Sequence, residues 1–288
     1  QREFSGNSFH LHTYMGVYEI RDRDEAVSIM VDKANIAADT IKNNYDCCVA
    51  YYDEHLLEIS IEQRRLLGEF EPALQNDEFV MYLQPQVKRD GAAKGAEALV
   101  RWVHPSRGIL TPYAFIDILE NAGLIYKLDL YIWEKAAQKL AEWKEKGYGS
   151  YHISVNISTK DFYIIDIYET FTGLINKYGI AASNLHLEIT ETTLMTDFEK
   201  NMNIIHKLQG VGFRVEIDDF GSGYSSLNML KDISADVLKI DMGFLRKSEN
   251  EVKGQDILES IITLAGKIGM DVITEGVETK KQLDMLTM

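Results

Sequence analysis

Short apolar runs alternate with longer stretches of helical periodicity over most of the chain. The runs predict β-strands, and the stretches between them predict helices because apolar residues recur there every three or four positions. The predicted strands are 79–87, 95–103, 152–158, 185–191, 214–220, 237–241 and 271–277. The predicted helices are 112–122, 128–146, 159–177, 193–210, 225–230, 255–268 and 279–286. This alternation is typical of a parallel α/β sheet and predicts a (β/α)8-type barrel whose eighth strand is not visible.

The first 76 residues have a different pattern. A strand is predicted at 11–20, a helix at 24–42 and a short strand at 47–52. A block of about 54 residues is small for an independent domain, so residues 1–54 are interpreted as part of a larger one. Residues 55–76 carry an apolar stripe at Leu56, Ile59, Leu66 and Phe70, which predicts a single connecting helix.

Polar residues stand in or just after the predicted strands of the long block. Acids at the carboxyl ends of parallel strands gather at one edge of the sheet, where α/β folds place their chemistry. Keeping such a cluster charged and buried is costly without a cation. Oxygen ligands favour Mg²⁺ or Mn²⁺ over Zn²⁺. The polar set is Glu97, Asn156, Glu188, Asp218, Asp219, Lys239 and Glu275, with Glu191, Asp241 and Glu278 nearby.

Each of these residues also has a plainer interpretation. Asp218 and Asp219 could form a polar turn before a helix cap, although adjacent carboxylates would also suit a pair of metal ions about 3.5–4 Å apart. Glu97 could form a salt bridge on an edge strand, Asn156 could cap a helix, and Lys239 could pair with an acid at the surface. The occurrence of such residues at six strand ends together is what favours a site.

Period-two alternation separates Glu188 from Glu191, because residues three apart on a strand face opposite sides. Only one of them should point inward, and Glu191 is expected to lie past the strand end. The seven histidines show no metal-binding spacing, and His10 and His12 are interpreted as solvated or core residues.

Composition narrows the classes of function. The chain has 288 residues, 45% hydrophobic, and a net charge of −15, which argues against DNA or RNA as a partner because a nucleic-acid surface needs a basic stripe. A small phosphorylated ligand remains compatible, since metal ions invert the local field. Cys47 and Cys48 are adjacent, which indicates reduced thiols rather than a disulfide framework. With no apolar run of eighteen residues, we expect a cytoplasmic protein, whose membrane anchor, if any, lies outside this chain.

Several segments together resemble the EAL-domain cyclic-di-GMP phosphodiesterases over roughly residues 67–288. They are Gln84–Pro85, Glu97–Ala98–Leu99 with Val100–Arg101–Trp102, Asn156, Glu188–Ile189–Thr190–Glu191, the run IDDFGSGYSS, Lys239–Ile240–Asp241 and Glu275–Gly276–Val277–Glu278. The resemblance implies a TIM-like barrel that hydrolyses one phosphodiester bond of cyclic di-GMP to linear pGpG with two Mg²⁺ or Mn²⁺ ions.

The resemblance also implies roles for individual residues. Metal binding falls to Glu97, Asn156, Glu188, Asp218, Asp219 and Glu275. Catalysis falls to Glu97, Lys239 and Glu275, with Lys239 contacting the attacking water and Glu275 either base or only ligand. Substrate contacts fall to Gln84, Leu99, Arg101, Asp241 and Glu278. Glu191 would anchor the loop that contains Gly221, Ser222 and Gly223, which in the family gates activity and borders a homodimer interface.

Residues 1–54 resemble the C-terminal part of a GGDEF (diguanylate cyclase-like) domain without its signature, so no synthesis of cyclic di-GMP is expected. Two positions of the long block depart from the family: Ser222 replaces the usual Thr, and Glu216 replaces a small apolar residue, so Glu216 is expected to find a partner or reach solvent. The family's last βα unit is absent after Met288. The alternatives are a catalytically inactive receptor for cyclic di-GMP and an unrelated barrel hydrolase.

Overall fold

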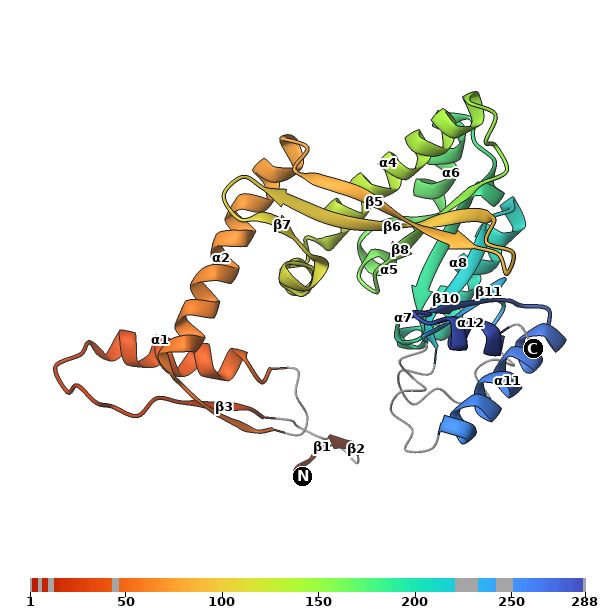
Figure 1. Ribbon diagram of the computed structural model, residues 1–288. Helices are drawn as coiled ribbons and strands as arrows, with labels where there is room; N and C mark the ends of the chain where they lie inside the picture. The colour runs from red at the N-terminus through yellow and green to blue at the C-terminus, as the bar shows by residue number, and fades with distance from the viewer. Residues whose placement is uncertain are drawn as a thin grey trace. The chain divides into compact units, whose positions relative to one another are not determined.

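The computed structural model describes residues 2–4, 7–9, 13–42, 47–220, 233–241 and 251–286. The chain forms two compact units, Gln1–Pro72 and Ala73–Met288 (Figure 1). No helix among these described residues is long and apolar enough to cross a membrane.

The second unit is built on one curled sheet (Figure 1). Its strands lie in the order β12-β11-β10-β9-β8-β6-β5, with β7 paired to β6. All seven predicted strands are present, and those from β6 to β12 along this order are parallel. The strands are β5 (Phe79–Val87), β6 (Ala93–His104), β7 (Gly108–Leu110), β8 (His152–Ile157), β9 (Leu185–Thr190), β10 (Arg214–Phe220), β11 (Val237–Asp241) and β12 (Asp271–Glu275).

The pair β5 and β6 is antiparallel, which the prediction of a parallel sheet missed. The reason is the short connection: residues 88–92 form a turn with Gly91 at φ 81°, whereas a parallel pair needs a crossover of a dozen residues or more. The sheet is therefore a curled α/β half-barrel whose first two strands, β5 and β6, are antiparallel.

Helices alternate with the strands as predicted, but three predicted helices are each divided, and the 112–122 segment breaks at Phe115. The 159–177 segment breaks before Asp166, whose side chain accepts a hydrogen bond from the Glu169 N–H and caps the second piece. The 193–210 segment breaks at Asp197, and 225–230 lies outside the described residues. The elements are η1 (Pro112–Ala114), α3 (Ile116–Asn121), α4 (Ile125–Glu145), α5 (Asp161–Ile164), α6 (Ile167–Tyr178), η2 (Ala182–Asn184), α7 (Glu191–Thr196), α8 (Phe198–Val211), α11 (Glu251–Lys267) and α12 (Lys280–Leu286).

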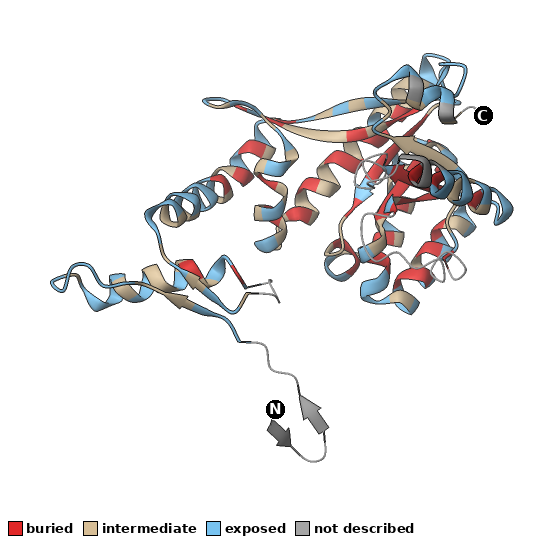
Figure 2. Cartoon of the chain, turned by 60° about the horizontal axis from the view of Figure 1, so that its bottom comes forward, coloured by how far each residue is buried: buried red, intermediate tan, exposed pale blue. Residues whose placement is uncertain are grey.

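The two faces of the sheet carry different side chains. On one face, alternate residues of the central strands are buried and apolar and form a core with the helices (Figure 2). Trp133 of α4 stacks near Phe171 of α6 at 4.5 Å, and its indole N–H donates to the backbone oxygen of Asn156 at 2.9 Å. The other face is polar: its residues are His152, Ser154 and Asn156 on β8, His186, Glu188 and Thr190 on β9, and Arg214, Glu216 and Asp218 on β10. The apolar set on β8, β9 and β10 is Ile153, Val155, Ile157, Leu185, Leu187, Ile189, Val215 and Ile217.

The first unit contains two small sheets and a helix. Strands β3 (Met15–Val17) and β4 (Val49–Tyr51) are parallel, and α1 (Val27–Asp39) packs closely on Gly16, where an added Cβ would lie 1.7 Å from the Ala34 oxygen. The hairpin of β1 (Arg2–Phe4) and β2 (Asn7–Phe9) was not predicted from the sequence. The predicted connecting helix is α2 (Glu54–Gln75).

Candidate active site

A buried lysine lies at the centre of the polar face. The Lys239 ammonium is within 2.8–3.2 Å of four carboxylates: Glu97 at 3.1 Å, Glu188 at 3.1 Å, Asp218 at 3.2 Å and Glu275 at 2.8 Å. Lys239 is 1% exposed. The idea of a surface pair between Lys239 and an acid is therefore wrong.

Five strands supply this cluster, here called the mouth cluster: Glu97 comes from β6, Glu188 from β9, Asp218 from β10, Lys239 from β11 and Glu275 from β12. Burial alone would lower the pKa of Lys239. The attraction of Glu188, followed by the other three acids, outweighs burial and raises that pKa. The lysine is therefore held as a cation, and it supplies one positive charge against four acids.

The mouth cluster leaves its buried oxygens poorly satisfied. Glu188 Oε1 is enclosed and accepts no hydrogen bond, while Glu188 Oε2 and Asp218 Oδ1 are enclosed beside the shared Lys239 ammonium at 3.1 and 3.2 Å. Burial raises the pKa of Glu188 well above its ordinary value, and Lys239 only partly opposes this rise. Burial likewise raises the pKa of Glu275. Buried carboxylates in this condition gain from a cation, so the donor set fits a hard divalent metal.

Asp218 and Asp219 are brought close by an irregular backbone. The register of β10 against β11 shifts between Ile217 and Phe220, and Asp219 adopts the left-handed conformation at φ 55°. This conformation is strained for a residue with a side chain, although Asp tolerates it better than most. Burial, and then the Asp218 charge, raise the pKa of Asp219. The two acids therefore interact, as a shared site requires.

Asn156 lies beside Glu97, to which its side-chain N–H donates at 3.4 Å. Its register partner is Glu188 on the next strand. Asn156 therefore faces the mouth cluster, which disfavours the helix-cap interpretation.

The predicted substrate contacts follow the β5–β6 ribbon and the ends of two later strands. Gln84 is the register partner of Glu97, and Leu99 and Arg101 lie on the same face as Glu97 by period two. The Arg101 guanidinium lies over the Tyr82 ring at 5.6 Å. The pair Asp241 and Glu275 are register partners, and the Glu278 N–H donates to Gln282.

Glu191 is the first residue of α7, just past β9, as expected from its spacing. Glu188 is fully buried, so it is the inward-facing member of the pair. The loop residues Gly221, Ser222 and Gly223 lie outside the described residues, and their role stays a prediction.

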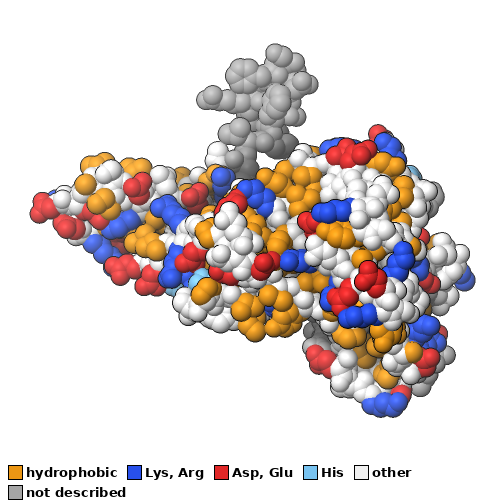
Figure 3. All heavy atoms as spheres, turned by 90° about the horizontal axis from the view of Figure 1, so that it is seen from above, with side chains coloured by type: hydrophobic (Ala, Val, Ile, Leu, Met, Phe, Trp, Pro, Cys, Tyr) orange, Lys and Arg blue, Asp and Glu red, His pale blue; other side chains and the backbone are white. Residues whose placement is uncertain are grey.

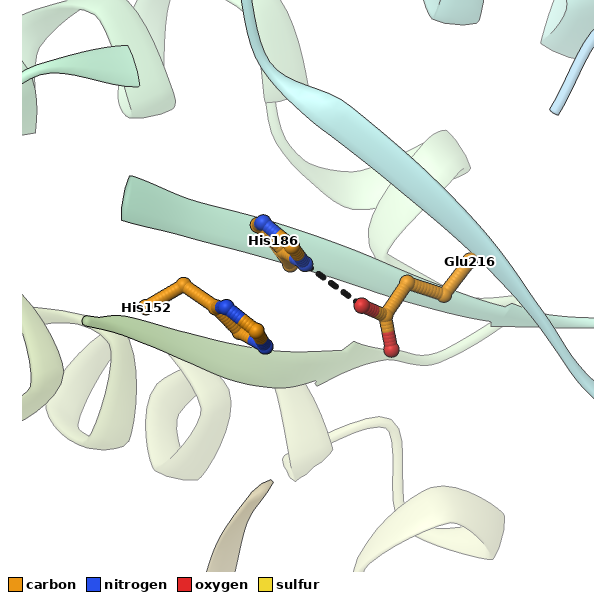
Figure 4. A group of neighbouring side chains, drawn as sticks. All are labelled: His152, His186 and Glu216. Carbon is orange, nitrogen blue, oxygen red and sulfur yellow. Dashed lines mark hydrogen bonds and ion pairs between the residues drawn. The ribbon is translucent and has the colours of Figure 1, made fainter. Parts of the chain in front are cut away.

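Sequence reasoning missed a second polar layer on the same strands. His152, His186 and Glu216 are buried neighbours, each offering one ligand atom within 4.8 Å of the others (Figure 4). The spacing of the histidines along the sequence gave no sign of this group, because strand pairing joins residues 34 and 30 positions apart. Period two gives a partial signal: His186 precedes Glu188 by two residues and Glu216 precedes Asp218 by two, so each shares a strand face with a predicted site residue. Glu216 has the expected partner, His186.

Comparison with known proteins agrees with this geometry. The chain matches the EAL domain over residues 68–288. It is 32% identical over 252 residues to the bifunctional diguanylate cyclase/cyclic di-GMP phosphodiesterase MucR of Pseudomonas aeruginosa, covering 87% of this chain and 36% of MucR. It is 32% identical over 215 residues to the cyclic di-GMP phosphodiesterase PdeR of Escherichia coli, covering 75% of this chain and 32% of PdeR.

A solved structure of the MucR phosphodiesterase in complex with c-di-GMP superposes with a TM-score of 0.73 and 33% identity, covering 77% of this chain and 91% of that one. The chain spans about a third of the length of the curated relatives it matches. The matched region, the curled sheet and the mouth cluster lead to one conclusion: the chain belongs to the EAL domain family.

Proposed function

We propose that this chain hydrolyses one phosphodiester bond of cyclic di-GMP to give linear pGpG, with divalent metal ions as cofactors. The observation that carries the proposal is the mouth cluster, in which four carboxylates surround one lysine and the buried Glu188 Oε1 accepts no hydrogen bond. Relatives named as cyclic di-GMP phosphodiesterases, and the MucR structure with c-di-GMP bound, support it.

Two Mg²⁺ or Mn²⁺ ions are proposed at this site. Bound there, they would make a water more acidic and stabilise charge on the phosphate oxygens. All of their proposed ligands are oxygen donors, as hard cations prefer. The proposed ligands are Glu97, Asn156, Glu188, Asp218, Asp219 and Glu275.

The chain's own side chains then position the reactants. Lys239 keeps its charge and presents N–H donors toward the acids, so it can also hold the attacking water by a hydrogen bond. The Arg101 fork matches phosphate oxygens, and Tyr82 beneath it limits its motion. Gln84 and Leu99 are proposed to contact the substrate from the same ribbon, with Asp241 and Glu278 contributing from the ends of β11 and β12.

The finer organisation is part of the same proposal. Residues 67–288 would be an EAL barrel, residues 55–76 a connecting helix and residues 1–54 part of a GGDEF-like domain. Glu191 would anchor the loop that contains Gly221, Ser222 and Gly223. This loop would border a homodimer interface. The protein would act in the cytoplasm. Nucleic acid is not proposed as a partner, and Figure 3 shows acidic and basic side chains interspersed over the face it presents.

The test is incubation of the purified chain with cyclic di-GMP and Mg²⁺ or Mn²⁺, with and without chelator, followed by chromatography. We expect pGpG only with metal, and a loss of pGpG in Glu97→Gln. Glu199→Gln, an exposed acid on α8, is the matched control and should match the unsubstituted chain. Intact substrate under all conditions would overturn the proposal. Tight binding of cyclic di-GMP without turnover would then identify a receptor.

A further inference from the structure

The trio of His152, His186 and Glu216, here called the floor trio, lies on the polar face of the sheet in a layer beside the mouth cluster. The three side chains come from adjacent strands β8, β9 and β10 and point toward one another (Figure 4). All three are buried, at 5%, 3% and 0% exposure. Within the part of the chain that the structure describes, these three residues form a group of possible metal ligands whose ligand atoms all lie within 4.8 Å of one another.

Hydrogen bonds and packing fix the members of the floor trio. The His186 Nδ1 and Glu216 Oε1 atoms are 2.5 Å apart. The two imidazoles stack with centroids 3.8 Å apart and planes 3° from parallel. The His152 Nε2 lies 2.7 Å from Gln86 Oε1, and the Gln86 amide N–H donates to Ser154 at 3.4 Å. An outer partner that holds a histidine ring in this way is typical of metal sites.

Gly95 leaves room for the His152 ring. The two residues are register partners on β6 and β8, and a Cβ at position 95 would lie 2.4 Å from His152 Nε2. Because that contact is too short, any side chain at this position would displace the imidazole. The space for His152 therefore depends on a glycine in the neighbouring strand.

The charges of the floor trio suit a cation. Glu216 Oε2 is fully buried and accepts no hydrogen bond, and Glu216 is the register partner of the acid Glu188. Burial, and then His186, lower the pKa of His152 to about 4, which leaves it as the neutral imidazole that binds metals.

We propose that His152, His186 and Glu216 form a separate site for one borderline divalent cation, of which Zn²⁺ is the representative. Two imidazole nitrogens and one carboxylate oxygen are a ligand set that Zn²⁺ accepts, whereas the all-oxygen mouth cluster suits Mg²⁺ or Mn²⁺. The cation replaces the proton between His186 and Glu216, and that proton is released to solvent. Since Zn–N distances are about 2.0–2.1 Å, the rings tilt out of their parallel stack to reach it. The bound ion ties β8, β9 and β10 together beside the mouth cluster.

The test is a Zn²⁺ titration of the metal-free chain against a chromophoric chelator, with excess Mg²⁺ to occupy oxygen sites. We expect one tight Zn²⁺ per chain. His152→Asn and His186→Asn should each weaken it by about 100-fold or more, and Gly95→Ala should weaken it while all three ligands remain. His206→Asn, an exposed histidine on α8, is the control and should bind as the unsubstituted chain does. Circular dichroism checks that each variant is folded.

A second measurement needs no variant. Zn²⁺ K-edge X-ray absorption of the unsubstituted chain with one equivalent of Zn²⁺ should show scattering from two imidazoles. Absence of imidazole scattering, or equal Zn²⁺ affinity in His152→Asn, His186→Asn and the unsubstituted chain, would overturn the proposal. The floor trio would then be a buried histidine–carboxylate pair only.

Discussion

The mouth cluster and the floor trio share strands β9 and β10, where their members are two residues apart, yet their buried acids have different partners. In the mouth cluster, four acids share one lysine, and Glu188 Oε1 accepts no hydrogen bond. In the floor trio, Glu216 Oε1 lies 2.5 Å from His186 Nδ1. Without a bound ion, Glu216 therefore keeps a hydrogen-bonded partner, whereas the four acids of the mouth cluster have one shared counter-charge.

The largest expected effect comes from removing the shared counter-charge. Lys239→Met leaves the buried acids of the mouth cluster without a cation, which should lower the free energy of unfolding of the metal-free chain by about 3–5 kcal/mol. Mg²⁺ should recover more stability in this variant than in the unsubstituted chain. Urea unfolding with and without Mg²⁺ measures both effects. Lys267→Met, on the exposed side of α11, is the control, and an equally small change in both variants would contradict the account.

Glu188→Gln should act on activity and stability in opposite directions. The variant loses a proposed metal ligand, so cyclic di-GMP hydrolysis should fall by about 10²–10³-fold. The metal-free chain should be no less stable at pH 8, because burial raises the pKa of Glu188 and its ionisation opposes folding there. Steady-state kinetics and thermal melting of one preparation give both values. Unchanged kinetics would show that Glu188 is not a ligand.

Replacing Glu216, unlike replacing Glu188, should make the metal-free chain less stable. Glu216→Leu leaves the buried His186 without its hydrogen-bond partner and should lower the free energy of unfolding by about 1–3 kcal/mol. Glu216→Gln keeps an accepting oxygen and should recover part of that loss. Chemical denaturation of the two variants side by side measures the difference. If Glu216→Leu were as stable as the unsubstituted chain, the acid would not be held by His186.

A smaller effect is expected at Asp129, a half-buried acid whose neighbour is a second acid, Asp161. Burial, and then the neighbouring Asp161, raise the pKa of Asp129 well above its ordinary value. The folded chain therefore keeps this proton to a higher pH than the unfolded chain, and stability is lost as the pH rises above about 4, the unfolded pKa. Asp129→Asn removes this loss, so its melting temperature should exceed that of the unsubstituted chain increasingly between pH 5 and pH 8. A constant gap would contradict the assignment.

Most of the sheet could be predicted from the sequence because apolar runs mark buried strands independently of their partners. Glu97, Glu188 and Lys239 could be placed at one edge because parallel strands end together. The bulge at Asp219 could not, since it depends on how β10 pairs with β11. The His152–His186 stack was also out of reach, because it arises from the register of strands whose sequences lie far apart. Local pattern predicts elements, and register decides which side chains meet.

The most direct test of the difference between the two layers is a Mn²⁺ titration followed by electron paramagnetic resonance, which counts free and bound ions. The account predicts that the unsubstituted chain binds Mn²⁺, that Glu188→Gln loses this binding, and that His186→Asn retains it. Equal Mn²⁺ binding by Glu188→Gln and the unsubstituted chain would contradict the assignment of the mouth cluster as the metal site.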